Sequence, residues 1–171
     1  MRYEIIFIFR CILYKSVIAE MFFSVYNGVV PVKQDFIFNK EDITTMGIKV
    51  GINGFGRIGR VLMRFLADDP ERFDVCGINL RKADIDYMVY LLKYDSVFRN
   101  FPGMVEHAGG DLIVNGHKIK VYSESDAAMI NWADSEAEYI IESTGANNTT
   151  DKASRHFKGG AKKVILSAPG K

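Results

Sequence analysis

The sequence predicts a doubly wound α/β fold with a mostly parallel sheet. Short apolar runs alternate with segments of helical periodicity, a glycine-rich turn joins the first run to the first helix, and glycine-containing turns separate several short strands. Strands that alternate with helices form parallel sheets covered on both faces. The 171 residues suffice for one domain of ordinary size.

The first strand and helix are joined by the run Asn53-Gly54-Phe55-Gly56-Arg57-Ile58-Gly59-Arg60. Apolar residues predict a buried strand over 48–52, and apolar residues three and four apart predict a helix over about 57–68. In such a turn the first glycine permits a tight bend, the second lets the backbone approach a pyrophosphate, and the third allows close helix packing. The helix N-terminus then faces the anion. This pattern predicts a Rossmann-type dinucleotide site. Its candidate residues are Asn53, Gly54, Phe55, Gly56, Arg57, Ile58 and Gly59.

The next elements follow from the same periodicities. A second strand is expected over 74–79, and a helix that begins at Ile85 has Asp84 as its N-cap. Between Met104 and Tyr122 the pattern changes to short strands, which predicts a small antiparallel insertion. Its two-residue turns are Gly109-Gly110 and Asn115-Gly116.

Three elements complete the expected sheet. A central strand is expected over 138–142, a helix over about 150–158 and a last strand over 164–166. Gly159 or Gly160 would cap the helix at its C-terminal end.

Polar residues follow several of these strands, at the edge where ligands of such sheets bind. The candidates are Asn79 after the second strand, Ser143-Thr144-Gly145 after the central strand, and Ser167 after the last one. The hydroxyls of Thr144 and Ser167 could equally serve neighbouring backbone groups.

Composition excludes several classes of function. A formal net charge of +1 argues against nucleic-acid binding, and no apolar run is long enough to span a membrane or to form a clean signal peptide. Cys11 and Cys76 predict neither a disulfide framework nor a metal site, so a reducing, cytoplasmic setting is expected. The three histidines form no metal pattern and are expected in loops or on the surface.

Four segments together resemble one enzyme family. They are 48–60, Asp86 to Ser96, Glu142-Ser143-Thr144-Gly145 and Gly159 to Pro169. In order and spacing they are similar to the phosphorylating glyceraldehyde-3-phosphate dehydrogenases, over residues 46–171. The resemblance implies NAD as cofactor, a role in glycolysis, a homotetrameric full-length protein, and oxidation of an aldehyde to an acyl phosphate.

The resemblance also implies a division of the chain. Members of the family begin near Met46, so residues 1–45 are expected to be an extension foreign to the family, such as upstream sequence read in frame. The family's catalytic cysteine and histidine follow the segment that ends at Pro169, and no residue here matches them. Cys76, in the second strand, is expected to be an inert core thiol. We therefore expect residues 46–171 to be a dinucleotide-binding domain incomplete at its C-terminal end, inactive alone. The alternatives are a non-catalytic nucleotide-binding fragment of an interrupted gene, or an erythrose-4-phosphate dehydrogenase.

Two positions depart from the family pattern. Leu80 stands where NAD-binding folds usually carry an acidic residue for the ribose hydroxyls, and Arg81 follows it. An arginine there could accept the 2′-phosphate of NADP, or it could be a solvated loop residue that leaves NAD preferred. Ser125 replaces an arginine that the family usually places beside the adenine.

Overall fold

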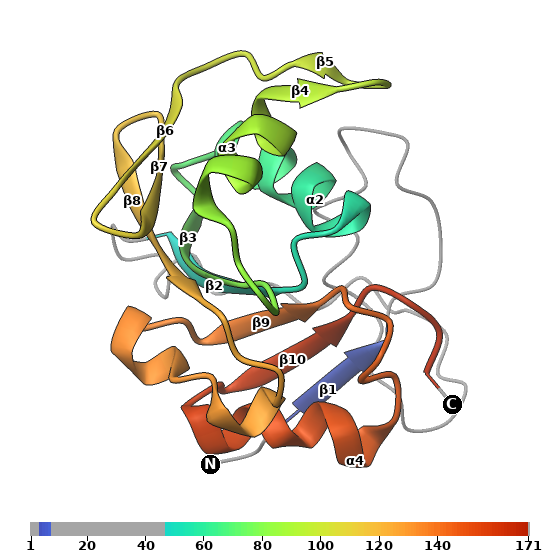
Figure 1. The fold of residues 1–171 in the computed structure, drawn as a ribbon. Helices are drawn as coiled ribbons and strands as arrows, with labels where there is room; N and C mark the ends of the chain where they lie inside the picture. Colours follow the sequence, from blue (N-terminus) through green and yellow to red (C-terminus); the bar gives the residue numbers. More distant parts are fainter. Residues whose placement is uncertain (1–3, 8–46, 171) are drawn as a thin grey trace.

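The structure is a computed structural model that describes residues 4–7 and 47–170 (Figure 1). Its described strands form an eight-stranded sheet in the order β1-β10-β9-β2-β3-β8-β7-β6. In this order, each neighbouring pair from β1 through β10, β9, β2 and β3 to β8 is parallel. The pairs β8-β7 and β7-β6 are antiparallel. The bounds are β1 (Glu4–Phe7), β2 (Ile48–Asn53), β3 (Phe73–Asn79), β6 (Val105–Ala108), β7 (Asp111–Val114), β8 (His117–Tyr122), β9 (Tyr139–Glu142) and β10 (Lys163–Leu166).

Helices cover both faces of this sheet, which confirms the doubly wound fold. Figure 1 shows α2 (Arg57–Ala67) and α3 (Ile85–Lys93) above it, with α4 (Thr150–Ala153) below. Three 3-10 helices complete the described helices: η1 (Ala127–Met129), η2 (Trp132–Ser135) and η3 (Ser154–Gly159). None of the helices in this part of the chain is long and apolar enough to cross a membrane.

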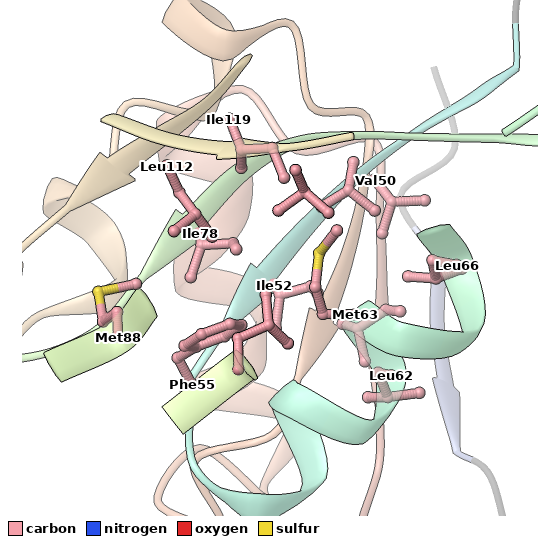
Figure 2. Close-up of a cluster of buried hydrophobic side chains, with 14 of the residues drawn as sticks. Val50, Ile52, Phe55, Leu62, Met63, Leu66, Ile78, Met88, Leu112 and Ile119 are labelled. Atoms are coloured by element: carbon pink, nitrogen blue, oxygen red, sulfur yellow. The ribbon is translucent and has the colours of Figure 1, made fainter. Parts of the chain in front are cut away.

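The helices form where the sequence signals them. Asp84 caps α3, and its carboxylate accepts a 3.1 Å hydrogen bond from the Tyr87 backbone N–H. One face of α2 buries Leu62, Met63 and Leu66 against the sheet. These side chains form the main core with Val50, Ile52 and Ile78 of the central strands (Figure 2). The alternation of apolar runs and amphipathic helices therefore predicted the layers correctly.

The segment 150–158 differs from the single helix that we expected. Its α-helical part ends at Ala153, and η3 continues in the tighter 3-10 form to Gly159. A Cβ on Gly159 would overlap the carbonyl oxygen of Ile130, so the backbone is pressed against the neighbouring segment there. Gly160, at φ 102°, ends the element in the left-handed conformation expected of a C-cap glycine.

Three strand pairings were not anticipated, one of them that of β1 with β10. The two-stranded sheet of β4 (Tyr94–Asp95) and β5 (Arg99–Asn100) closes a turn in which Asp95 Oδ1 accepts the N–H groups of Val97 and Phe98, both at 2.8 Å. The antiparallel strands of 105–122 are confirmed, and the last of them, β8, also pairs in parallel with β3. The insertion is thus continuous with the main sheet.

The extension contributes the strand β1 at one edge of the sheet. Residues Glu4–Phe7 pair in parallel with Lys163–Leu166 of β10, in a register that joins Glu4 to Lys163 and Phe7 to Leu166. Residues 1–3 and 8–45 of the extension lie outside the described residues. An unpaired edge strand exposes a row of backbone groups, so β1 covers the groups that β10 would otherwise present.

Proline in β1 is expected to reveal this pairing. In an edge strand only alternate N–H groups point toward the neighbour, and proline has no N–H to donate. One of the two variants Ile5→Pro and Ile6→Pro should therefore lose a ladder hydrogen bond, at a cost of about 1 kcal/mol, and the other should lose much less. Urea unfolding of both variants checks this. Equal, unchanged midpoints would mean that β1 adds nothing to stability.

Candidate functional site

The three glycines of the loop after β2 occupy three different environments. Gly54 has φ 98°, and a Cβ there would lie 2.8 Å from the Thr144 backbone nitrogen. A Cβ on Gly59 would overlap the carbonyl oxygen of Gly54. Gly56 is exposed, and a Cβ on it would meet nothing within 4 Å. The backbone is therefore packed against the protein at Gly54 and Gly59 and is open at Gly56. In a dinucleotide site the pyrophosphate approaches the protein backbone at this second glycine.

The N-terminus of α2 has no side-chain cap. Gly56, the N-cap, makes no side-chain capping bond, and the first turn contains no acidic residue. The first i−4 bond of the helix runs from the Arg60 N–H to the Gly56 carbonyl, at 3.0 Å. The earlier N–H groups have no partner within the helix, so the helix end can receive an anion. Arg57 is exposed beside it, whereas Phe55 is buried in the core and offers its side chain to packing.

Backbone hydrogen bonds join the ends of three strands at this loop. The Gly54 N–H donates to the Asn79 carbonyl at the end of β3, at 2.8 Å. The Ser143 N–H donates to the Asn53 carbonyl at 2.8 Å, and the Ser143 hydroxyl donates to the Gly54 carbonyl at 2.7 Å. The structure thus brings together Asn53, Gly54, Asn79 and Ser143, as the sequence predicted.

A buried carboxylate lies directly under these strand ends. Glu142, the last residue of β9, is only 3% exposed. Its Oε2 accepts hydrogen bonds from Asn53 Nδ2 at 2.6 Å, Asn147 Nδ2 at 3.0 Å and His156 Nε2 at 3.0 Å. Its Oε1 accepts the Thr144 N–H at 2.8 Å and the Thr144 hydroxyl. Five donors therefore hold this charge and fix the turn that follows β9.

The amides of Asn53 and Asn79 extend this network across the sheet. Asn79 Nδ2 donates to Asn53 Oδ1 at 2.7 Å and to the Glu124 carbonyl at 3.0 Å, and Asn79 Oδ1 accepts the Glu124 N–H at 2.8 Å. Both asparagines are buried. Their side chains therefore hold the loop by internal hydrogen bonds and do not reach a ligand at the surface.

His156 contradicts the expectation that all three histidines are loop or surface residues. It is completely buried, and its Nδ1 accepts a hydrogen bond from Trp132 Nε1 at 3.0 Å. An indole N–H can only donate, so the imidazole proton lies on Nε2, which points to Glu142. Sequence analysis missed these roles of Glu142, His156 and Trp132. One signal was present: a glutamate that ends the apolar run Tyr139–Glu142 requires a partner once buried.

The network keeps Glu142 ionised. Burial by itself raises the pKa of this carboxyl group, but the hydrogen bonds from His156, Thr144, Asn147 and Asn53 outweigh burial and lower the pKa from 4.5 to about 2. A fixed negative charge thus lies beside the strand ends, and the first turn of α2, which carries the positive end of the helix dipole, contains no acidic residue.

The remaining candidate residues lie around this centre. Thr144 and Gly145 are exposed in the turn after β9, and Gly145 has φ 73°. Ser167 is half-buried, and its N–H donates to the Glu142 carbonyl at 3.0 Å. Among the outer positions, Leu80 is half-buried, whereas Arg81 and Ser125 are exposed. No hydrogen bond joins Ser125 to the other candidates in the described part of the chain.

Neither a metal centre nor a reactive thiol accompanies the site in the described ranges. No group of three or more His, Cys, Asp or Glu side chains there could hold a metal ion. Burial raises the pKa of the Cys76 thiol to about 12, with a further rise from Asp74. This half-buried thiol in β3 donates a 3.6 Å hydrogen bond to the Val50 carbonyl, which fits the expected inert cysteine.

Comparison with known proteins gives a consistent result. Residues 48–150 match the family model described as the NAD-binding domain of glyceraldehyde 3-phosphate dehydrogenase. The chain is 57% identical over 121 residues to glyceraldehyde-3-phosphate dehydrogenase 2 of Drosophila melanogaster, 55% over 124 residues to the enzyme of Lentinula edodes, and 52% over 122 residues to that of Danio rerio. These matches cover 71%, 72% and 71% of the chain, and 36% of each relative. The chain therefore spans about a third of the length of the curated relatives it matches.

Proposed function

The chain belongs to the glyceraldehyde-3-phosphate dehydrogenase family, and on this premise we propose that it is the NAD-binding part of a phosphorylating glycolytic enzyme. The observation that supports the proposal most strongly is the glycine loop, which is open only at Gly56 and leads into an uncapped helix N-terminus. Such a loop suits the pyrophosphate of a dinucleotide.

The residues of this chain would bind and orient the cofactor. The pyrophosphate would lie against the N–H groups at the start of α2, and the turn Ser143-Thr144-Gly145 would border the cofactor further along the sheet edge. Bound NAD would supply the hydride acceptor for the oxidation of an aldehyde. In the longer protein, phosphate would then release the product as an acyl phosphate.

We expect the 171-residue chain to bind NAD without turning over glyceraldehyde 3-phosphate or erythrose 4-phosphate. Conversion of an aldehyde to an acyl phosphate through a covalent intermediate needs an activated nucleophile. Cys76 does not supply one, because the pKa of its thiol is raised to about 12. Isothermal titration calorimetry with NAD, and absorbance of NADH in the presence of aldehyde and phosphate, test both parts. Measurable turnover by the purified chain would refute the inactivity, and absence of NAD binding would refute the proposal itself.

A homotetramer is proposed for the longer protein, as the family resemblance implies. One surface feature supports further contacts: three tyrosines of α3 and β4 are more than half exposed and lie in a row. Tyr87 stacks on Tyr90 with ring centroids 6.4 Å apart, and Tyr90 lies 5.2 Å from Tyr94. Exposed aromatic rows of this kind are typical of interfaces.

A further inference from the structure

The end of β3 lacks the feature that normally makes a dinucleotide site selective for NAD. In this fold an acidic side chain about 20 residues after the glycine loop binds the ribose hydroxyls and disfavours a 2′-phosphate. Leu80 holds that position. Its side chain packs against the main core, and its N–H donates to the Tyr122 carbonyl at 3.1 Å. The position therefore offers neither a carboxylate for the hydroxyls nor a repulsive charge against phosphate.

The turn after Leu80 presents two cations instead. Arg81 and Lys82 are both exposed, and neither has an ion-pair partner among the side chains of residues 47–170. The turn has a defined shape, since Lys82 adopts φ 57° and the Ala83 N–H donates to Ser123 Oγ at 3.1 Å. The two charges thus project from a turn that is anchored at both ends.

Two carboxylates are also near this turn: Asp84 follows it in sequence, and Glu124 follows Ser123, which the Ala83 N–H contacts. Asp84 Oδ1 accepts the Tyr87 N–H as the cap of α3. The side chain of Glu124 is exposed, and its backbone is bonded to Asn79. Glu124, whose side chain has no capping role, is therefore the rival group that we test as a replacement for the missing acid.

We propose that the Leu80–Ala83 turn accepts a 2′-phosphate on the adenosine ribose, with Arg81 as its main ligand, so that this site binds NADP as well as NAD. The proposal rests on the dinucleotide-binding function proposed above. A guanidinium forms charge-assisted, bidentate hydrogen bonds with phosphate oxygens, which suits Arg81 better than Lys82 for this contact.

Calorimetric titration of the 171-residue chain with NAD, NADP, 5′-ADP and 2′,5′-ADP tests the proposal. We expect the Kd values of NAD and NADP to lie within about tenfold of each other, which corresponds to about 1.4 kcal/mol. Binding of NAD with no binding of NADP would overturn this inference alone. Binding of neither dinucleotide would instead overturn the proposed function.

Three variants and one control assign the effect. Arg81→Ala should weaken the affinity for NADP by about tenfold and leave the affinity for NAD unchanged. Leu80→Asp should shift the ratio of the two affinities further in favour of NAD. Lys118→Ala, an exposed cation of β8 paired with Asp111, is the matched control and should change neither affinity. A shift of the ratio in Glu124→Gln but not in Arg81→Ala would assign the discrimination to Glu124 and overturn the proposal. Because Arg81 lies on the surface, this test does not depend on the folding of the Leu80 variant.

Discussion

Gly59→Ala is expected to destabilise the protein by about 3 kcal/mol and to abolish NAD binding. The added Cβ would overlap the carbonyl oxygen of Gly54, a backbone atom that is itself held by the Ser143 hydroxyl. Overpacking typically costs about 1–3 kcal/mol. We expect roughly the upper end of this range, because the atom that the Cβ meets belongs to the backbone and not to a flexible side chain. The helix would have to move away from the loop, and the N–H groups that face the pyrophosphate would move with it.

Urea unfolding followed by the fluorescence of Trp132 measures the first effect. Trp132 is the single tryptophan of the chain and is completely buried, so its emission reports the loss of the core. Calorimetry with NAD measures the second effect. A Gly59→Ala protein of unchanged stability and affinity would show that close helix packing at this glycine is not required.

Glu142→Gln is expected to cost about 2–4 kcal/mol of stability, because each buried donor left without an acceptor costs about 1–3 kcal/mol. Glutamine keeps the volume but offers one acceptor oxygen and one NH₂ group to donors that now share a carboxylate. The NH₂ group would then oppose either Thr144 or the cluster of Asn53, Asn147 and His156. Since total stabilities are about 5–15 kcal/mol, this is a large share.

The same carboxylate predicts a pH dependence. The pKa of Glu142 is about 2 in the folded protein and 4.5 as its ordinary value, so folding favours the ionised form. A group with a depressed folded pKa adds stability above its unfolded pKa, and the addition is lost as pH falls from 4.5 toward 2. The contribution at pH 7 is on the order of 3 kcal/mol.

Unfolding curves of the wild type and of Glu142→Gln at pH 7 and at pH 3 check both effects. The stability difference between the two proteins should be largest at pH 7 and should shrink at pH 3. Glu138→Gln is the matched control, because Glu138 makes only a half-exposed ion pair with Lys162 and should change stability little. Equal effects of the two substitutions would contradict a special role for the buried network.

Features set by neighbouring residues could be predicted from the sequence. The N-cap of α3 at Asp84, the tight bend at Gly54, the close packing at Gly59 and the hairpin turn Asn115-Gly116 all depend on local geometry. Asn115 at φ 52° and Gly116 at φ 82° have the positive values that such a two-residue turn requires. These are the elements for which sequence and structure agree most closely.

Features set by distant partners could not be predicted. His156 is 24 residues from Trp132 and 14 from Glu142, and only the fold brings both to its ring. The strand β1 likewise depends on pairing with β10 at the opposite end of the chain, and its four residues carry no periodic signal of their own. The helical periodicity after Thr149 did not reveal the change to the 3-10 form at Ser154, and the close approach of Gly159 to Ile130 also depends on a residue distant in sequence.

The most direct test of the glycine loop as a pyrophosphate site is calorimetric titration of Gly56→Ala with NAD. Gly56 has φ −73°, and an added Cβ would meet nothing within 4 Å, so the variant should unfold at the same urea concentration as the wild type. A bound pyrophosphate, however, would need the space that the methyl group fills. We predict unchanged stability with NAD affinity reduced at least about tenfold. Wild-type affinity in a stably folded Gly56→Ala protein would contradict the account.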